Sequence, residues 1–240
     1  MTAEIPGDDS VWVVVAAAGE SRRMGLPDGE SKQFLMLGGE HVICHSVRRI
    51  LEIDQVAGAV VVLHPSHTVR FADDLSHIAE TKPLLIAEGG RTRADSVRAG
   101  LQLIPADAAY IAVHDGARPL FSHHVFDDCL KALKDFDGAV PGYAVSDTLK
   151  RASADGKIAK TVDRAGLWAV QTPQVFRGEA LRSVYSRSDL NGATDDAALL
   201  EAAGYSVAVV PSTPGNVKIT TPADLPLAGA ILSWEIVADV

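Results

Sequence analysis

Residues 11–18 of this 240-residue chain form an unbroken run of β-branched, aromatic and small apolar side chains, VWVVVAAA. A strand that is buried on both faces has this composition, and such strands lie in the middle of parallel sheets. The run ends at Gly19, and a polar loop follows to about Gly39. We therefore predict a central strand whose carboxyl end carries a long loop.

Apolar runs and amphipathic stretches alternate after this loop. Such alternation is typical of βαβ units, so we expect an α/β fold: a Rossmann-like, mostly parallel sheet flanked by helices. In this first part of the chain we predict strands at 59–63, 84–87 and 110–114 and helices at 42–52, 67–80, 93–104 and 122–135.

The pattern changes after residue 138. A strand at 138–145 is followed by a polar stretch, 146–164, which contains Asp155-Gly156, a strong turn signal. Strands this polar do not belong to a core, so we predict a β-hairpin arm at about 145–165 that projects from the domain. Because an isolated hairpin is marginally stable, we expect the arm to pack on a second copy of the chain. The remaining predicted elements are helices at 178–188, 194–203 and 222–236 and strands at 206–210 and 216–220.

The composition is that of a globular domain with an acidic surface. The net charge is -9, which disfavours nucleic acid and anionic membranes as partners. Cys44 and Cys129 each lie in an apolar stretch without metal-ligand spacing, so we expect buried thiols in a reducing compartment. The first ten residues have no signal-peptide pattern, and no apolar run is long enough for a membrane helix. We predict a cytoplasmic chain with a flexible tail at residues 1–10.

The first candidate site segment joins AAAGESRRM (16–24) to SKQF (31–34). Ala17, Ala18 and Gly19 let a ligand approach the backbone closely, and Arg23 and Lys32 follow in the loop. This pattern predicts a phosphate-binding loop at the carboxyl edge of the sheet, where such folds bind ligands. A solvated basic loop is the alternative. The segment lacks the GxGxxG fingerprint, which disfavours a dehydrogenase.

The second segment is EGGRTRADS (88–96). Gly89 and Gly90 follow a predicted strand, and Arg93 and Ser96 share a face of the next helix. An arginine at a helix N-terminus opposes the helix dipole, which favours an anion there. The alternative is a plain strand–turn–helix connection with Asp95 near the cap.

The third segment is VHDGARP (113–119), in which a strand ends at Asp115 and Gly116. Asp115 at the end of a parallel strand is suited to a ribose hydroxyl or to Mg²⁺, and Arg118 to a phosphate. An Asp115–Arg118 ion pair that closes the turn is the alternative. We interpret His114 as a packing histidine.

Three further residues have simpler local interpretations. The alternation around Lys218 predicts a solvent-facing lysine on the strand at 216–220. Asp195 and Asp196 have the position of helix-start acids.

From about residue 11 to 236 the chain resembles the 2-C-methyl-D-erythritol 4-phosphate cytidylyltransferases of the non-mevalonate isoprenoid pathway. The segments that carry the resemblance occur in the family's order: AAGESRRM, KQFL, GGRTRADSV, VHDGARP, DTLKR, TVDRAGLW, QTPQVF, TDDA and NVKITTPADL. The resemblance implies a single nucleotidyltransferase domain over residues 11–240. It also implies an enzyme that transfers CMP from CTP to methylerythritol phosphate with Mg²⁺, and a homodimer formed through the arm.

The resemblance also implies roles for single residues. Arg23, Lys32 and Lys218 would stabilise charge during transfer. Arg118 and Thr172 would face the methylerythritol phosphate, and Thr148 and Arg164 would reach the site from the second subunit's arm. The nucleotide would be held by Ala17, Ala18, Gly19, Gly89, Gly90, Arg93, Ser96, Asp115 and Gly116, with Asp115 also near the metal.

The sequence departs from the family at several positions. Ala16 and Ser31 stand where proline is usual, and Ser21 where glycine is usual. A ribitol-5-phosphate cytidylyltransferase is an alternative with overlapping motifs, and a non-catalytic nucleotide-binding protein is a more remote one.

Overall fold

The fold is built around a twisted sheet in which β1 (Val11–Ala17) is central, as its apolar run predicts. The computed structural model describes residues 10–19, 21–27, 30–78, 82–187 and 194–238, so nearly all of the predicted tail lies outside the described residues. β1 pairs in parallel with β4 on one side and with β6 on the other, and β5 continues the parallel part beyond β4. The α/β prediction is thereby confirmed. The other strands of this sheet are β4 (Val56–Leu63), β5 (Leu84–Glu88), β6 (Tyr110–Asp115), β7 (Gly138–Ala144), β10 (Trp168–Val170), β11 (Gln174–Arg177) and β12 (Val207–Pro211).

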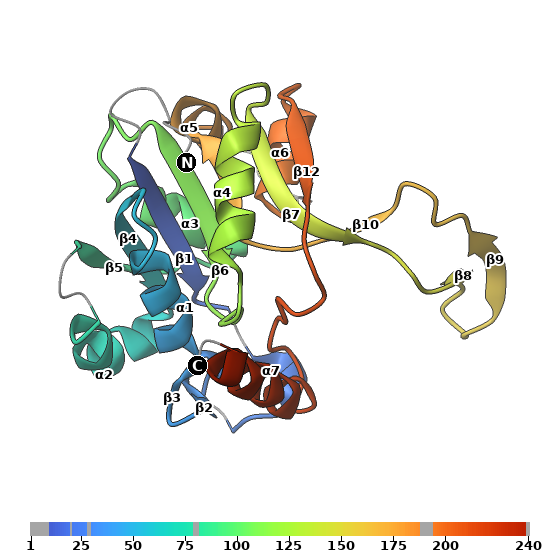
Figure 1. The fold of residues 1–240 in the computed structure, drawn as a ribbon, viewed down its shortest axis with the longest axis horizontal. Helices are drawn as coiled ribbons and strands as arrows, with labels where there is room; N and C mark the ends of the chain where they lie inside the picture. Colours follow the sequence, from blue (N-terminus) through green and yellow to red (C-terminus); the bar gives the residue numbers. More distant parts are fainter. Residues whose placement is uncertain (1–9, 20, 28–29, 79–81, 188–193, 239–240) are drawn as a thin grey trace.

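Helices cover both faces of the sheet (Figure 1). Val13 and Val15 of β1 face a core with α1, α2 and α4, whereas Trp12 and Val14 face a core with α3, α5 and α6. Because neighbouring residues of a strand point to opposite faces, a continuous apolar run is what a strand between two helical layers requires. The helices of these layers are α1 (Val42–Leu51), α2 (Pro65–Ser76), α3 (Arg93–Leu101), α4 (His123–Ala132), α5 (Gly178–Tyr185) and α6 (Asp196–Ala202).

The predicted helices are present, with shifted ends. α2 begins two residues earlier than expected, and the expected helical residues 79–80 and 188 lie outside the described part of the chain. Val97, Leu101 and Ile104 of the predicted helix at 93–104 are all buried, since residues at this spacing share one face of a helix. Both cysteines are buried and unpaired, which confirms the expectation of buried thiols.

The sheet also contains two antiparallel strands that the sequence analysis does not predict. β11 lies between β6 and β7 and runs antiparallel to both, while β10 pairs with the end of β7. These strands have three and four residues, so they are too short to show a convincing alternation. Their partners are far away in the sequence, and only tertiary pairing reveals them.

The polar segment forms the predicted arm, which projects from the body of the molecule (Figure 1). β8 (Leu149–Ala152) pairs antiparallel with β9 (Ile158–Val162) and with no strand of the main sheet. Gly156 has a φ of +83° in the turn between them, a conformation that glycine adopts without steric cost.

The prediction of a strand at 216–220 is wrong. Between β12 and α7 (Asp224–Ala238) the chain joins no sheet, and it lies instead along the loop that follows β6. Ile219 donates a backbone hydrogen bond to Ala117, and Ile219 is fully buried. The apolar alternation arises because Ile219 packs under the loop, without a neighbouring strand to form a ladder.

The loop after β1 contains several short elements against which the C-terminal helix packs. Met24, Leu37 and Val42 form a small third core with Ala228 of α7. Among the helices that the structure describes, none has the length and apolarity required to cross a membrane. The short elements of this loop are two 3-10 helices, η1 (Arg22–Met24) and η2 (Lys32–Phe34), and the paired strands β2 (Met36–Leu37) and β3 (Glu40–His41).

Candidate functional site

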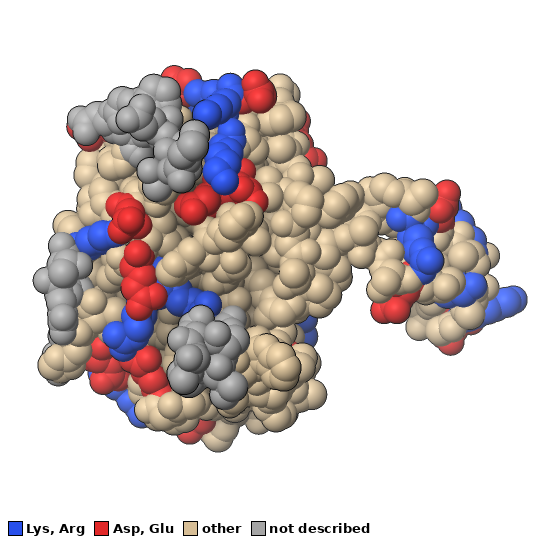
Figure 2. All heavy atoms as spheres, in the orientation of Figure 1, with Lys and Arg blue, Asp and Glu red and all other residues tan. Residues whose placement is uncertain are grey.

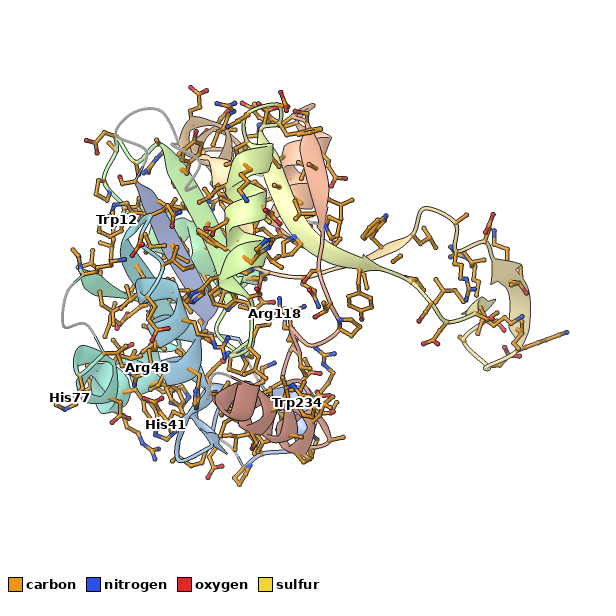
Figure 3. The ribbon with its side chains drawn as sticks, in the orientation of Figure 1. Trp12, His41, Arg48, His77, Arg118 and Trp234 are labelled. Carbon is orange, nitrogen blue, oxygen red and sulfur yellow. The ribbon has the colours of Figure 1, made fainter. Side chains whose placement is uncertain are left out.

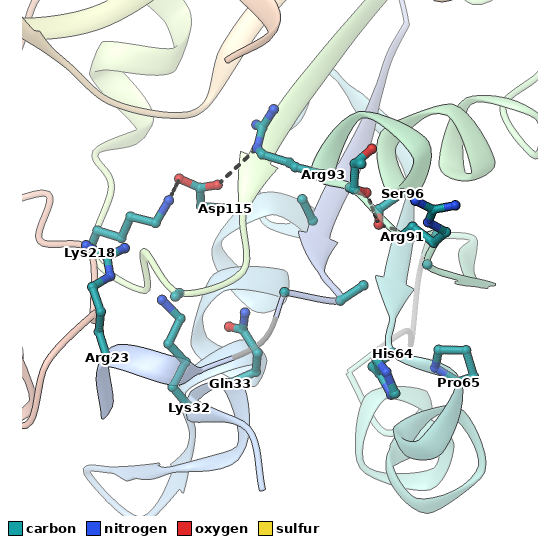
Figure 4. A pocket seen from close by; sticks show the side chains of 17 residues that line it. Arg23, Lys32, Gln33, His64, Pro65, Arg91, Arg93, Ser96, Asp115 and Lys218 are labelled. Carbon is teal, nitrogen blue, oxygen red and sulfur yellow. Dashed lines mark hydrogen bonds and ion pairs between the residues drawn. The ribbon is translucent and has the colours of Figure 1, made fainter. Parts of the chain in front are cut away.

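A cavity of about 870 Å³ lies at the carboxyl edge of the parallel strands. Gly19 follows β1, His64 follows β4, Gly89 follows β5, and Asp115 is the last residue of β6. This is the edge at which open α/β sheets bind ligands, and the volume lies within the range of small-molecule sites. Figure 4 shows Arg23, Lys32 and Lys218 at one end of the cavity and His64, Pro65 and Arg91 at the other.

The two-glycine loop after β5 approaches the end of β1 too closely for a side chain. A Cβ on Gly89 would lie 2.2 Å from the Cβ of Ala18 and 3.0 Å from Ser96 Oγ. The Ser96 hydroxyl accepts a hydrogen bond from the Gly90 N–H at 3.2 Å and donates one to the Thr92 carbonyl at 2.9 Å. The loop is therefore held rigidly and exposes backbone to the cavity.

Thr92 and Asp95 form a capping box at the start of α3. The plain strand–turn–helix connection considered as an alternative is therefore present. It coexists with the cavity, because Gly90, Arg93 and Ser96 line the cavity from the same loop and helix turn.

Asp115 is the carboxylate around which the cations of the cavity gather. Its Oδ2 is 2.7 Å from Lys218 Nζ and 3.5 Å from Arg118 Nε, and its Oδ1 is 3.8 Å from Arg93 Nε. Burial raises the pKa of Asp115, but the nearby charges of Lys218, Arg93 and Arg118 outweigh burial and hold this pKa below its usual range. Asp115 is therefore ionised at neutral pH.

Lys218 is placed differently from the sequence prediction of a solvent-facing lysine. The side chain is about one-third exposed, and its ammonium group reaches into the cavity to contact Asp115. The prediction fails for Lys218 for the same reason as for the strand at 216–220. The segment lies along the loop after β6, so Lys218 faces the end of β6.

A second acid holds Arg93 from behind the cavity. Arg93 Nη2 donates to Asp196 Oδ2 at 2.7 Å, and the Asp196 side chain is fully buried at the start of α6. The Tyr185 hydroxyl donates to the other oxygen of Asp196 at 2.5 Å. Asp195, the residue before, accepts from the Ala198 N–H as the N-cap of α6, which confirms its interpretation as a helix-start acid. Asp196 is also a helix-start acid, as the first residue of α6, and its carboxylate fixes a cavity arginine as well.

Lys32 lies at the start of η2, and two serines attach this turn to the preceding loop. The Lys32 N–H donates to Ser21 Oγ at 2.8 Å, and Ser31 caps η2. Burial lowers the pKa of Lys32 to about 8, and the charge of Lys218 adds to this effect. Two of the residues that depart from the family, Ser21 and Ser31, thus stabilise the backbone at Lys32.

Four other predicted site residues lie behind the cavity lining in the described structure. Ala17 is buried, and Gly116 donates its N–H to the Ala16 carbonyl at 3.0 Å. Arg118 lies between the end of β6 and the segment before α7 (Figure 3), where it donates to the Asn216 carbonyl at 2.7 Å. The Asp115–Arg118 ion pair raised as an alternative is present as well. Thr172 is buried.

Thr172 and His114 fix the backbone at Asp115. Thr172 Oγ1 accepts from the Asp115 N–H at 3.0 Å and lies 3.2 Å from His114 Nδ1. His114 Nε2 is 3.0 Å from the Arg118 carbonyl, so it must be the donor, and Nδ1 accepts from Thr172. Burial lowers the pKa of His114 to about 4, so the ring is neutral, as expected of a packing histidine.

Thr148 and Arg164 lie on the arm and are exposed, away from the cavity of their own chain. Arg164 donates to the Ser146 carbonyl across the arm. The contact of Thr148 and Arg164 with a substrate bound in another subunit stays a prediction. The contact of Arg118 and Thr172 with methylerythritol phosphate stays a prediction as well.

The cavity also contains residues that the sequence analysis does not single out. Gln33 lies within a segment chosen for its lysine, and Arg91 lies within the segment chosen for Arg93 and Ser96. His64 and Pro65 come directly after a predicted strand. Their position at its carboxyl end is the one sequence signal that could have identified them. The lining residues outside the predicted set are Ala16, Gln33, His64, Pro65, Arg91, Thr92 and Ala117.

Comparison with known proteins gives a consistent assignment. Residues 11–234 match the sequence model of the family described as 2-C-methyl-D-erythritol 4-phosphate cytidylyltransferase. The protein of that name from Symbiobacterium thermophilum is 40% identical over 227 residues, which cover 94% of each chain. The solved structure of 2-C-methyl-D-erythritol 4-phosphate cytidylyltransferase from Thermus thermophilus is 30% identical. It superposes with a TM-score of 0.73 over 92% of this chain and 98% of that one.

Longer relatives match as well. The bifunctional enzyme IspD/IspF from Sinorhizobium medicae is 40% identical over 236 residues, and the match spans 96% of this chain but 58% of that protein. The chain thus covers little more than half the length of these relatives. By its match over nearly the whole sequence and by its fold, this chain belongs to the 2-C-methyl-D-erythritol 4-phosphate cytidylyltransferase family.

Proposed function

We propose that this chain transfers the CMP group of CTP to 2-C-methyl-D-erythritol 4-phosphate, giving 4-diphosphocytidyl-2-C-methyl-D-erythritol and pyrophosphate. The observation that carries the proposal is the cavity at the carboxyl edge of the sheet, in which Arg23, Lys32, Arg93 and Lys218 gather in a chain of net charge -9. Such a concentration of cations fits a polyanionic ligand, and membership of the family supplies the chemistry.

The reaction needs charge stabilisation more than covalent help from the protein. An oxygen of the acceptor's phosphate forms a bond to the α-phosphorus of CTP, and the bond from that phosphorus to the bridging oxygen breaks in line. The electron pair of that bond leaves with pyrophosphate. A phosphate monoester is already largely deprotonated at neutral pH, so the nucleophile needs no general base.

The cations have distinct tasks in this scheme. Arg23, Lys32 and Lys218 lie at the end of the cavity where the triphosphate would bind, and they would stabilise the charge that grows on the leaving oxygens. Because Asp115 and Asp196 both hold Arg93, its charge is already oriented before the ligand arrives. The backbone N–H and C=O groups of the Gly89-Gly90 loop would recognise the cytosine.

We also propose Mg²⁺ as the cofactor. In nucleotide enzymes Mg²⁺ is held by one or two carboxylates together with substrate phosphates, and ionised Asp115 at the cavity wall fits that donor set. No group of three or more His, Cys, Asp or Glu side chains that could form an all-protein site occurs in the described part of the chain. When bound, the ion would neutralise charge on the triphosphate.

A homodimer formed through the arm is part of the proposal. Ile158 of the arm is 61% exposed, and Trp168 and Val170 at its base are also exposed. Exposed apolar side chains on a hairpin of marginal stability favour burial against another subunit. Figure 2 shows basic and acidic side chains on the arm; residues 145–165 contain five Lys and Arg against three Asp, in a chain of net charge -9. A cytoplasmic location stays a prediction.

Pyrophosphate release tests the proposed reaction. The purified chain is assayed with CTP and Mg²⁺, with methylerythritol phosphate or ribitol 5-phosphate as acceptor, and without an acceptor as the control. Turnover with methylerythritol phosphate that EDTA abolishes is the expected result. Turnover only with ribitol 5-phosphate would refute the acceptor, and CTP binding without release of pyrophosphate from either acceptor would refute the activity.

A further inference from the structure

Gln33 places a carboxamide in the wall of the cavity, and its oxygen accepts no hydrogen bond from any residue that the structure describes. The residue is only 3% exposed, yet it lines the cavity between Lys32 and the end of β1 (Figure 4). Within the residues that the structure describes, Oε1 is buried and unpaired. Buried polar side chains nearly always have partners, so this exception requires an explanation.

The backbone around Gln33 is well held, so the unpaired oxygen does not reflect a loose segment. Gln33 is the middle residue of η2, whose N-cap is Ser31, and the preceding Lys32 N–H is bound to Ser21. A Cβ on Gly116 would lie 3.5 Å from Gln33 Oε1. The amide is therefore packed against the turn that follows β6, beside Asp115.

This position is suited to an anionic ligand. Because its oxygen accepts no hydrogen bond from a described residue, the Gln33 carboxamide can turn about its last bond and present its NH₂ group to a ligand. The cations nearby repel one another, and this repulsion by Lys218 and Arg23 contributes to the lowered pKa of Lys32. An uncharged donor adds a hydrogen bond to a phosphate without increasing that repulsion.

We propose that Gln33 is a nucleotide-binding residue whose carboxamide NH₂ group donates a hydrogen bond to a phosphate oxygen of CTP. The inference rests on the proposed function, since it takes CTP as the ligand of the cavity. It assigns to Gln33 part of the affinity for the triphosphate and none for the second substrate.

Two substitutions test the assignment. Gln33→Met keeps the length and volume of the side chain and removes both polar atoms, while Gln33→Glu keeps the shape and directs a carboxylate at the phosphates. We expect the dissociation constant of CTP, measured by calorimetry with Mg²⁺, to rise about tenfold in Gln33→Met and further in Gln33→Glu. The KM for methylerythritol phosphate should stay unchanged.

Thermal stability distinguishes a ligand-binding role of Gln33 from a purely structural one. Replacing an unpaired buried amide by an apolar side chain of the same volume should leave the Tm of Gln33→Met equal to that of the wild type or higher. A structural glutamine would instead lower the Tm and leave CTP affinity unchanged. Gln102→Met is the matched control, because Gln102 is exposed at the end of α3 and should affect neither quantity.

Cytidine, used as a competitor, locates the contact. The loss should appear with CTP and be absent with cytidine, which has no phosphate. CTP affinity within twofold of wild type in both variants, or an equal loss with cytidine, would overturn the proposal. Pyrophosphate release by the wild type is read separately, so failure of the proposed reaction would not be confused with failure of this contact.

Discussion

Lys218 Nζ lies 2.7 Å from Asp115 Oδ2, although 103 residues separate the two in the chain. The contact joins the end of β6 to the segment before α7, and it orients an ammonium group that a flexible side chain would otherwise leave free. Arg118 reinforces the same junction through the Asn216 carbonyl. Lys218 is therefore positioned before any ligand arrives, which is a condition for electrostatic catalysis.

Lys218→Ala should lower kcat by about 100-fold, because a preorganised positive charge stabilises the transition state more than the ground state. Steady-state kinetics with CTP and methylerythritol phosphate measure the effect, and the CTP dissociation constant should change much less. Lys134→Ala, at an exposed position away from the cavity, is the control. A rise in KM alone, with kcat preserved, would contradict this role.

Asp196→Ala should destabilise the fold by about 3 kcal/mol, because it removes one partner of a buried ion pair. Arg93 would lose the nearer of its two carboxylate partners, and the Tyr185 hydroxyl would lose its acceptor. Urea unfolding measures the change in the free energy of unfolding. The control is Glu201→Ala, an exposed position on the same helix, which should stay within about 0.5 kcal/mol of wild type. Equal stability of the two variants would refute the anchoring role.

The pH dependence of kcat/KM for CTP should reveal Lys32. Burial and neighbouring cations lower its pKa to about 8. In the free enzyme its amine is therefore positively charged below this pH and neutral above it. Because kcat/KM reports the free enzyme, it should fall as the pH rises through about 8. Bound triphosphate stabilises the charged form, so the fall in kcat should come at higher pH.

Lys32→Arg is the matched variant for this profile. A guanidinium stays protonated throughout the accessible range, so the alkaline fall should disappear even if overall activity is lower. A fall with the same midpoint in Lys32→Arg would assign the titration to another group.

Stability depends on Lys32 in the opposite direction to activity. Its pKa is lower in the folded state than in the unfolded chain, where it is near 10.5. The unfolded state therefore binds more protons between these two values, and the contribution of Lys32 to the free energy of unfolding rises with pH across that window. Urea unfolding at about pH 7.5, below this window, and at about pH 9.5, within it, should show the free energy of unfolding of the wild type rising relative to that of Lys32→Met.

The arm predicts complementation between subunits. Arg164→Ala should abolish most turnover, although Arg164 is exposed on the arm and lies outside the cavity of its own chain. Mixing that variant with Lys218→Ala should restore part of the activity, because a heterodimer would contain one site with both residues intact. Two different affinity tags, one on each variant and purified in series, isolate the heterodimer. Verified heterodimers without recovered activity would show that the sites are not shared.

The sequence by itself determined the layered fold and the edge of the sheet at which the cavity lies. β1, α1, α3 and β6 follow from the period of their apolar residues, which is a local property of the chain. Gly89-Gly90 and Asp115 could be assigned to a ligand edge because the carboxyl ends of parallel strands meet there. Asp155-Gly156, a strong turn signal, predicted the turn between the two strands of the arm.

Only the tertiary structure decided which side chains meet. Lys218 resembles a solvent-facing strand residue by its neighbours and Asp196 a simple helix-start acid, yet one contacts Asp115 and the other holds Arg93. The Gln33 amide is buried against Gly116, and its oxygen has no partner among the described residues, which no local pattern of the sequence indicates. Periodicity describes how a segment presents its own faces, whereas these contacts depend on which distant segment packs against that face.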